Sequence, residues 1–247
     1  MPWPTVPVRH GRRCRKPSID VALAVTRDEI DAASRLVHRC YVRRGYVKPS
    51  PDGRHVSPFL SLPSTTVFVA RVDGAVVATV SLIGDSARRL PSDALWASEL
   101  GLLRTEGQRL AEVSALAVSE AWRGGGLAML RALVRAVGVY AREIARLDTL
   151  CIAVHPRHAA FYEALLRFRR FGALTACDAV NGAPAIGLRL DLRDLDRPLD
   201  AAFAAAVFAP EERRAVRASL QRSLTRWRLG RSLKFLHRYI APTTAEA

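Results

Sequence analysis

Hydrophobic and polar residues follow two different periods along the middle of the chain, and these periods predict its secondary structure. Runs of apolar and β-branched residues predict strands at residues 20–25, 65–85, 109–118, 147–155 and 182–192. Apolar residues spaced three and four apart predict helices at residues 26–45, 124–146 and 156–168. The stretch 46–63 holds four prolines and predicts a loop, and 90–107 predicts a short helix with a loop.

Local signals define two of these elements more closely. Thr26 stands three residues before Glu29, the spacing of a capping box, so the first helix should begin there. The pair Asp73-Gly74 divides the 65–85 run and predicts the turn of a β-hairpin. The resulting order predicts an α/β fold that begins largely antiparallel and contains one βαβ crossover around residues 124–126. On the helix of that crossover we expect Arg131, Arg135, Arg142 and Arg146 to face solvent.

The chain is strongly basic, with a net charge of +15 over 247 residues. Five basic residues and no acid lie within 1–18, and nine Lys or Arg against three Glu lie within 201–247. This distribution indicates a proline-rich basic tail at 1–17, a domain at 18–195 and a basic extension at 196–247. The apolar residues of the extension repeat at helical spacing: Val216, Leu220, Leu224 and Trp227, then Leu233, Leu236 and Ile240.

Such a charge points to an acidic partner, which is an acidic protein, a membrane surface or nucleic acid. The sequence holds no recognised nucleic-acid-binding motif, so nucleic acid is the least favoured of the three. A helix packed on the domain with a solvated arginine face is the alternative for the extension.

Several classes are disfavoured by what the sequence lacks. No apolar run approaches the roughly 20 residues of a membrane span, and the basic start has no apolar signal region. The four cysteines are scattered without CxxC or zinc spacing, which indicates reduced thiols in a cytoplasmic protein. No His, Cys or Asp cluster has metal-ligand spacing, so we expect no metal.

Three consecutive glycines, Gly124–Gly126, stand between a predicted strand and a predicted helix. Free N–H groups at a helix N-terminus favour an anion, and glycine lets it approach the backbone. No Lys-Ser or Lys-Thr follows as in a P-loop, and the G-x-G-x-x-G pattern is absent. The spacing Arg123-x-x-Gly126-x-Ala128 resembles the (Q/R)-x-x-G-x-(G/A) loop of GNAT-fold acyltransferases, which holds the pyrophosphate of a pantetheine-bearing donor. A glycine-rich connection without a ligand is the alternative.

Longer stretches narrow this resemblance. "RLAEVSALAV", "AVHPRHAAFYEALLRF" and "VNGAPAIGLRLDL" are similar to the long-chain N-acyl amino acid synthases of the FeeM type. So are "RCYVRRGYV" and "LPSTTVFVARVDGAVVATVSLIGDS", and the resemblance covers about residues 34–192. It implies a GNAT fold, with a mixed, mostly antiparallel twisted sheet flanked by helices, here followed by a basic helical extension. It also implies relation to the homoserine-lactone autoinducer synthases, a donor carried on acyl carrier protein or CoA, an amino acid acceptor, and no tightly bound cofactor.

Amide formation needs a base for the amine, donors for the oxyanion and a proton for the departing thiolate. Glu112 lies inside an apolar strand, where burial raises the pKa of a carboxyl group and suits it to act as the base. A surface carboxylate paired with an arginine is the alternative. By strand alternation Ser114 and Leu116 share the face of Glu112, and Ser114 is a candidate for orienting the base or the acceptor.

Further roles follow from the resemblance alone. It implies that the backbone N–H groups of Ala117 and Val118 polarise the thioester carbonyl. It implies that Tyr162 protonates the thiolate, although a buried aromatic beside Phe161 is the alternative. The donor loop then comprises Arg123, Gly124, Gly125, Gly126, Leu127 and Ala128. In the autoinducer relatives an arginine often follows the serine, whereas this chain has Ala115.

His155 and His158 flank Pro156-Arg157 and are candidates for the acceptor carboxylate or the phosphates, or simply turn and helix-start residues. The favoured interpretation is an N-acyltransferase that makes N-acyl amino acids. Its alternatives are a GNAT acetyltransferase that uses acetyl-CoA on another amine, and a non-enzymatic basic binding module. In the favoured interpretation the basic extension recruits acyl carrier protein, and peripheral contact with the inner membrane face is a second role.

Overall fold

The computed structural model describes residues 18–196 and 209–229. Seven strands form one sheet in the order β1-β2-β3-β4-β5-β7-β6. The strands are β1 (Asp20–Leu23), β2 (Thr65–Val72), β3 (Ala75–Gly84), β4 (Leu110–Val118), β5 (Thr149–Val154), β6 (Arg169–Cys177) and β7 (Ala183–Asp191). The helices are α1 (Arg27–Arg43), α2 (Asp93–Thr105), α3 (Gly126–Val139), α4 (Pro156–Leu166) and α6 (Pro210–Leu229). The α/β class and the mixed, mostly antiparallel sheet are therefore confirmed.

The early elements form where their local signals place them. Thr26 accepts a hydrogen bond from the Glu29 backbone, and Glu29 reaches back to the Thr26 backbone, so the capping box begins α1. Asp73 and Gly74 both have positive φ, which suits the turn between β2 and β3. Among the strands of the described residues, β4 and β5 are the pair that runs parallel, with α3 between them, and this is the predicted crossover.

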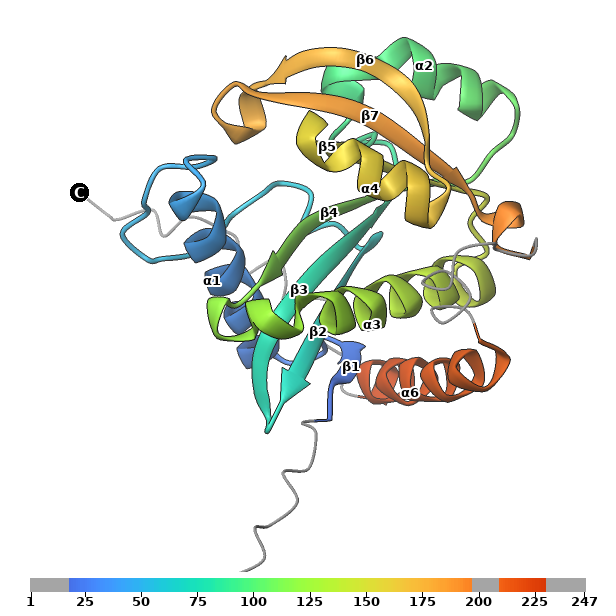
Figure 1. Cartoon of the computed structure of the whole chain (residues 1–247). Coiled ribbons are helices and arrows are strands. Elements are labelled where there is room, and N and C mark those ends of the chain that lie inside the picture. Colours follow the sequence, from blue (N-terminus) through green and yellow to red (C-terminus); the bar gives the residue numbers. More distant parts are fainter. Residues whose placement is uncertain (1–17, 197–208, 230–247) are drawn as a thin grey trace, which may run out of the picture.

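The helices cover both faces of the sheet (Figure 1). On one face α3 packs on the central strands through Met129, Leu133 and Ala136, and α4 adds Ala159 and Leu166 to the same core. On the other face α1 packs against β4 through Leu36, Val37 and Cys40. Leu100 and Leu103 of α2 pack over Leu110 and Cys151. The core therefore lies on both sides of β4, the strand that carries the candidate base.

The β6 strand was not predicted from the sequence. It forms the edge of the sheet next to β7, and α2 lies against it. The Trp96 indole of α2 donates to the carbonyl of Ala173 at 3.0 Å and packs edge-on against Phe171. Gly172 makes this possible, since a Cβ there would come within 2.5 Å of the indole.

The extension is packed against the domain over its described part. α6 lies against α3 and β1 (Figure 1), and Leu220 is fully buried, with Val216 and Leu224 packed beside it. Arg135 of α3 pairs with Glu212 of α6, so the expectation that Arg131 and Arg135 face solvent is wrong. Both are partly covered, because α6 shields that side of α3. The predicted apolar positions Leu233, Leu236 and Ile240 lie outside the described residues.

Candidate active site

The strands β4 and β5 part from each other in the middle of the sheet. They pair only from Leu110↔Thr149 to Glu112↔Cys151, although β4 continues to Val118 and β5 to Val154. On the other side of β4, the register with β3 shifts between Thr79 and Ser81, and Ala115 takes a φ of 53°. Between these pairs β4 has one residue more than β3. The irregularity is a β-bulge, which turns the strand away from its neighbour. The backbone of β4 beyond Glu112 is thereby released from β5.

An apolar cavity of about 60 Å³ lies behind the parted strands, between the sheet, α3 and α4. Apart from the Tyr162 hydroxyl, its walls are apolar. They are formed by Val80, Val113, Leu116, Leu130, Leu133, Val134, Val137, Gly138, Leu150, Ile152, Tyr162, Leu166, Phe168 and Leu190. An apolar site of this kind suits a hydrocarbon chain and gives no charged group a partner.

Glu112 is buried, with 3% of its surface exposed, at the last paired position before β4 and β5 part. One carboxylate oxygen accepts from the Ser92 backbone N–H, at the start of α2, at 2.7 Å. Burial raises the pKa of Glu112 to about 7, while the bond from Ser92 opposes this shift. A pKa near neutrality lets a carboxylate accept a proton and release it again at physiological pH. The alternative of a surface carboxylate paired with an arginine is wrong.

The bulge corrects one expectation about this strand. Ser114 lies opposite Ser81, and Glu112 lies opposite Ile83. The side chains of Glu112 and Ser114 therefore share a face of the sheet, as predicted. Leu116 does not share it, because the extra residue at Ala115 reverses the alternation. Leu116 instead joins Val113 in the wall of the apolar cavity on the other face. The base and the cavity therefore lie on opposite faces of β4, and Glu112 is the last residue of β4 that pairs with β5.

Tyr162 of α4 lies in the cavity wall, between Phe161 and Phe168 with ring centroids 5.4 and 5.6 Å away. Burial raises the pKa of its phenol. Its hydroxyl has no hydrogen-bond partner among the described residues. A neutral phenol can donate a proton, and the same ring packs between two aromatic side chains, so this position agrees with the catalytic prediction and with the packing alternative.

The donor loop has the expected place in the fold. A 3₁₀ turn over Glu120–Gly125 follows β4, and α3 begins at Gly126. A Cβ added at Gly126 would meet no atom within 4 Å, so no contact inside the described chain requires glycine here. Leu127 is 53% exposed and Ala128 is also exposed. The side chain of Arg123 lies outside what the structure describes. A ligand can thus approach the start of α3 closely.

The remaining candidates lie at the start of α4. His155 caps that helix, because its Nδ1 accepts from the Arg157 backbone at 3.2 Å. The alternative interpretation of His155 as a helix-start residue is therefore confirmed. His158 is exposed and accepts from Arg157 Nε at 3.1 Å.

Sequence reasoning missed Ser92, whose backbone holds the carboxylate of Glu112. The Pro91-Ser92-Asp93 segment is recognisable as a helix start, but its contact with β4 spans 20 residues of chain. The sequence carries no signal for that contact.

Comparisons with known proteins agree with this geometry. The sequence model of the family described as N-acyl amino acid synthase FeeM matches residues 32–191. The solved structure of FeeM, an N-acyl amino acid synthase from uncultured soil microbes, is 34% identical with a TM-score of 0.63. That alignment covers 72% of this chain and 93% of FeeM.

Two more distant structures are similar in fold. The AHL synthase LasI is 16% identical with a TM-score of 0.54, over 78% of this chain and 94% of LasI. An acyl-CoA N-acyltransferase from Pseudomonas aeruginosa is 20% identical with a TM-score of 0.50, over 70% of this chain and 99% of that protein. The search of curated proteins finds no significant match. These neighbours confirm the GNAT acyltransferase fold.

Proposed function

The chain belongs to the FeeM family of N-acyl amino acid synthases and is an acyltransferase that acts on an amine, and from this premise we propose its reaction. We propose that it transfers a long-chain acyl group from a pantetheine thioester to the α-amine of an amino acid. The product is an N-acyl amino acid. The observation that carries the proposal is the buried carboxylate of Glu112 at the point where β4 and β5 part, with an apolar cavity on the other face of the same strand.

The cavity supports a long acyl group and gives it a direction. Leu116 and Leu130 lie at the end where β4 has left β5, and Tyr162 lies in the same wall. Leu150, Gly138 and Leu190 lie toward the paired end of the strands. An acyl chain whose thioester carbonyl lies at the parted strands therefore extends toward Gly138 and Leu190. An acetyl group would leave nearly all of this apolar surface unused, which disfavours the acetyltransferase alternative.

The start of α3 suits the donor's phosphate. The helix contributes about half a positive charge and free N–H groups at this end. The open space around Gly126 lets a phosphate or pyrophosphate approach the backbone. Both acyl carrier protein and CoA present a phosphate on the pantetheine arm, so the loop serves either donor. The acidic surface of a carrier protein would add an attraction to this basic chain.

The proposed roles account for each proton of the reaction. The Glu112 carboxylate takes a proton from the ammonium of the acceptor, directly or through water, and the amine attacks the thioester carbon. The N–H groups of Ala117 and Val118 hold the oxyanion that forms. As the C–N bond forms and the C–S bond breaks, Tyr162 gives its proton to the thiolate. The second proton of the amine leaves to solvent, and the proton taken by Glu112 passes through solvent to restore the Tyr162 phenol. Ser114 orients the base or the acceptor.

The test uses the purified full chain with acetyl-, octanoyl- and palmitoyl-CoA, and with the same acyl groups on acyl carrier protein. Each donor is combined with a panel of amino acids, and products are measured by mass spectrometry. We expect N-acyl amino acids, with the long-chain donors preferred. Equal or faster transfer of acetyl groups would contradict the proposal and favour the acetyltransferase. Product formation without the protein is the background that each value must exceed.

A further inference from the structure

Ser92 stands at the N-cap of α2, but its side chain does not cap the helix. The Ser92 carbonyl accepts a helical hydrogen bond from the Trp96 N–H at 2.9 Å. Its φ and ψ are −69° and −11°, which are helical values, whereas a serine that caps a helix usually has extended values. Within the described residues, its side chain forms no bond to the first turn. The helix therefore leaves this hydroxyl unused.

The Ser92 hydroxyl is also a buried polar group without a hydrogen-bond partner. The residue is 1% exposed, and no atom of the described chain bonds to its Oγ. An unpaired hydroxyl in the interior is unfavourable, and native proteins hold few of them. Since α2 does not use this hydroxyl, its role lies with another group beside it.

The base lies beside this hydroxyl. The Ser92 N–H donates to a carboxylate oxygen of Glu112 at 2.7 Å. The hydroxyl belongs to the same residue, and rotation about the Cα–Cβ bond moves it relative to that carboxylate. Burial has the largest effect on the pKa of Glu112 and raises it, whereas the Ser92 N–H and the Ser92 hydroxyl both lower it. A carboxylate accepts several hydrogen bonds, so one residue can supply two donors to it.

The titratable groups that act on Glu112 come from α2, β5 and β6, and those of the described chain do not stabilise its negative charge. The charge of Asp93 raises the pKa of Glu112 further. Cys151 lies opposite Glu112 on β5, and burial raises the pKa of that thiol to about 12. Burial also raises the pKa of Cys177 at the end of β6. Both thiols are neutral near pH 7, so the ionised base depends on hydrogen bonds such as those from Ser92.

Arg104 of α2 fixes the segment that carries Ser92. Its guanidinium donates to Asp85 at 3.0 Å and to Asp93 at 2.7 Å, and thereby joins the two ends of the connection between β3 and α2. The three side chains are largely buried. The Asp85 N–H donates to the carbonyl of Leu110, at the start of β4, at 3.0 Å. This chain of contacts holds Ser92 against the strand that carries the base.

Resting on the proposed role of Glu112 as the base, we propose that Ser92 is a positioning residue. Its N–H and its hydroxyl together hold the ionised carboxylate of Glu112, and Arg104 keeps Ser92 in place. When Glu112 ionises, the hydroxyl rotates onto the carboxylate and gains the partner that it lacks. A hydrogen bond to an ionised oxygen is stronger than one to a neutral oxygen, so the hydroxyl favours the ionised form. Ser92 is buried and acts on the reaction through Glu112.

The first test measures the pKa of Glu112 by NMR, on the full chain labelled with carbon-13 at the glutamate carboxyl groups. The signal of Glu112 is the one that is lost in Glu112→Gln. We expect Ser92→Ala to raise this pKa by about one unit, the loss of a hydrogen bond to a charged group. The matched control is Ser64→Ala, which removes another buried hydroxyl without a partner, just before β2 and two strands from β4. It should leave the pKa of Glu112 unchanged.

Turnover of Ser92→Ala gives a second measurement. Its kcat/KM should fall about tenfold near pH 6, because less of the base is ionised, and should approach the wild-type value near pH 9. The melting temperature near pH 5 should not fall, because Glu112 is then protonated and α2 loses no cap. An unchanged pKa of Glu112 in this variant would overturn the proposal. A loss of activity that is the same at every pH would also overturn it.

Arg104→Lys tests the contact of Arg104 with the two carboxylates without removing a charge. Lysine lacks the planar fork with which a guanidinium binds two carboxylates, so Ser92 should be held less firmly. We expect hydrogen exchange of the Ser92 amide to become about tenfold faster, and the pKa of Glu112 to rise. Unchanged exchange of that amide would refute the role of Arg104.

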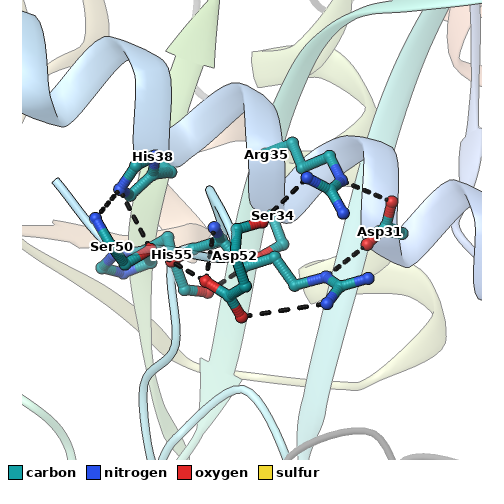
Figure 2. A network of polar contacts seen from close by, with 8 residues as sticks. Asp31, Ser34, Arg35, His38, Ser50, Asp52 and His55 are labelled. Carbon is teal, nitrogen blue, oxygen red and sulfur yellow. Dashed lines mark hydrogen bonds and ion pairs between the residues drawn. The ribbon is translucent and has the colours of Figure 1, made fainter.

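A second arginine that is shared by two carboxylates provides the control for Arg104→Lys. Figure 2 shows the polar network between α1 and the loop that follows it, where Arg54 pairs with Asp31 at 2.6 Å and with Asp52 at 3.8 Å. Arg54→Lys should lower the melting temperature, but it should change neither the exchange of the Ser92 amide nor the pKa of Glu112. Equal effects of the two lysine variants on that pKa would contradict a specific role of Arg104.

The two proposals can fail separately. A wild type that makes no N-acyl product from any acceptor would refute the proposed reaction. The titration of Glu112 does not depend on turnover, so it would still decide whether the Ser92 hydroxyl holds this carboxylate. A wild type that makes the product, together with an unchanged pKa in Ser92→Ala, would leave the reaction in place and overturn the role of Ser92.

Discussion

Burial of Glu112 affects the stability of the fold and the reaction in opposite ways. The buried carboxyl has a pKa of about 7, whereas its usual value is 4.5. The folded state therefore binds the proton more tightly than the unfolded state does. The stability from this group is fully present below about pH 4.5 and is lost as the pH rises through about 7. The ionised form, which the reaction needs, is thus the form that the fold disfavours.

We expect Glu112→Gln to separate these consequences. Loss of the base should lower kcat/KM about 10²–10⁴-fold near neutral pH. The deficit should shrink above about pH 8, where the α-amine deprotonates without help. Thermal unfolding should show the opposite sign, with the variant more stable than the wild type by up to about 3 kcal/mol near pH 8 and by nothing near pH 4.

The control for this variant is Glu163→Gln, which removes a partly exposed carboxylate paired with Arg170. It should change neither property by a comparable amount, because exposed ion pairs contribute little. A fully active Glu112→Gln variant at neutral pH would remove this residue from the reaction.

Gly138 is the second residue with a specific consequence. It lines the apolar cavity from α3, near the end where we place the terminal methyl of the acyl chain. Gly138→Ala and Gly138→Val should fill this end and shift the preferred acyl chain to progressively shorter lengths. Each excluded methylene should cost about fourfold in kcat/KM, from about 0.8 kcal/mol per methylene.

The measurement is kcat/KM over a series of acyl-CoA donors that differ by two carbons. The shortest donors should react as well with both variants as with the wild type, which controls for damage to the fold. An unchanged length preference in Gly138→Val would show that the acyl chain does not reach this glycine.

At the scale of elements, local signals predicted most of the fold. The capping box of α1, the Asp73-Gly74 turn and the β4–α3–β5 crossover each depend on neighbouring residues, and each is confirmed. The β6 strand was missed because it lies at the edge of the sheet and most of its side chains are exposed or half-buried on both faces. The packing of this strand depends on the Trp96 indole lying against Gly172, where a side chain would leave no room. This contact spans 76 residues of chain.

In the candidate site too, some features could be predicted from the sequence and others depend on how the chain folds. A carboxylate in an apolar strand is visible in the sequence, so Glu112 could be found. The bulge beside it could not, because Ala115 takes a positive φ without the glycine that would signal one. The side on which Leu116 lies, and hence the wall of the cavity, follows from that bulge. Contacts such as Ser92 with Glu112 arise only when α2 packs on the sheet.

The start of α3 allows a matched pair of substitutions. Gly126→Asp puts a carboxylate where the donor phosphate should bind, and the space around it is open, so the fold should survive. We expect the KM for acyl-CoA to rise at least about tenfold through like-charge repulsion, with the KM for the amino acid unchanged. Gly101→Asp, in a helix and with equally open space, adds the same charge away from the site. Equal KM values for the two variants would contradict the donor loop.

At the scale of the whole molecule, α6 combines two kinds of arginine. Arg213 and Arg217 pair with Glu143 of the segment after α3, and Arg135 pairs with Glu212. These contacts hold the helix in place, together with the buried Leu220. Arg214, Arg222 and Arg226 are exposed instead. No helix among the described residues is long and apolar enough to cross a membrane.

The exposed arginines offer the sharpest test of the acidic-partner proposal. A field from several charges attracts a whole acidic protein, whereas the phosphate of CoA is met locally at the start of α3. Replacing Arg214, Arg222 and Arg226 by Ser should therefore raise the KM for acyl carrier protein donors about tenfold and leave acyl-CoA nearly unchanged. The difference should fade as salt rises, because screening over about 8–10 Å weakens the attraction in the wild type as well.

The matched control is the double variant Arg213→Ser with Arg217→Ser, which breaks the pairs with Glu143 and should mainly lower the melting temperature. A loss that is equal for both donors in the triple variant, together with a lower melting temperature, would mean that the arginines act on the fold. Unchanged kinetics with both donors would refute recruitment of a carrier protein by α6. Binding to anionic vesicles, compared between the wild type and the triple variant, then decides whether this face serves a membrane surface instead, since an electrostatic contact of that kind is also lost with these three charges.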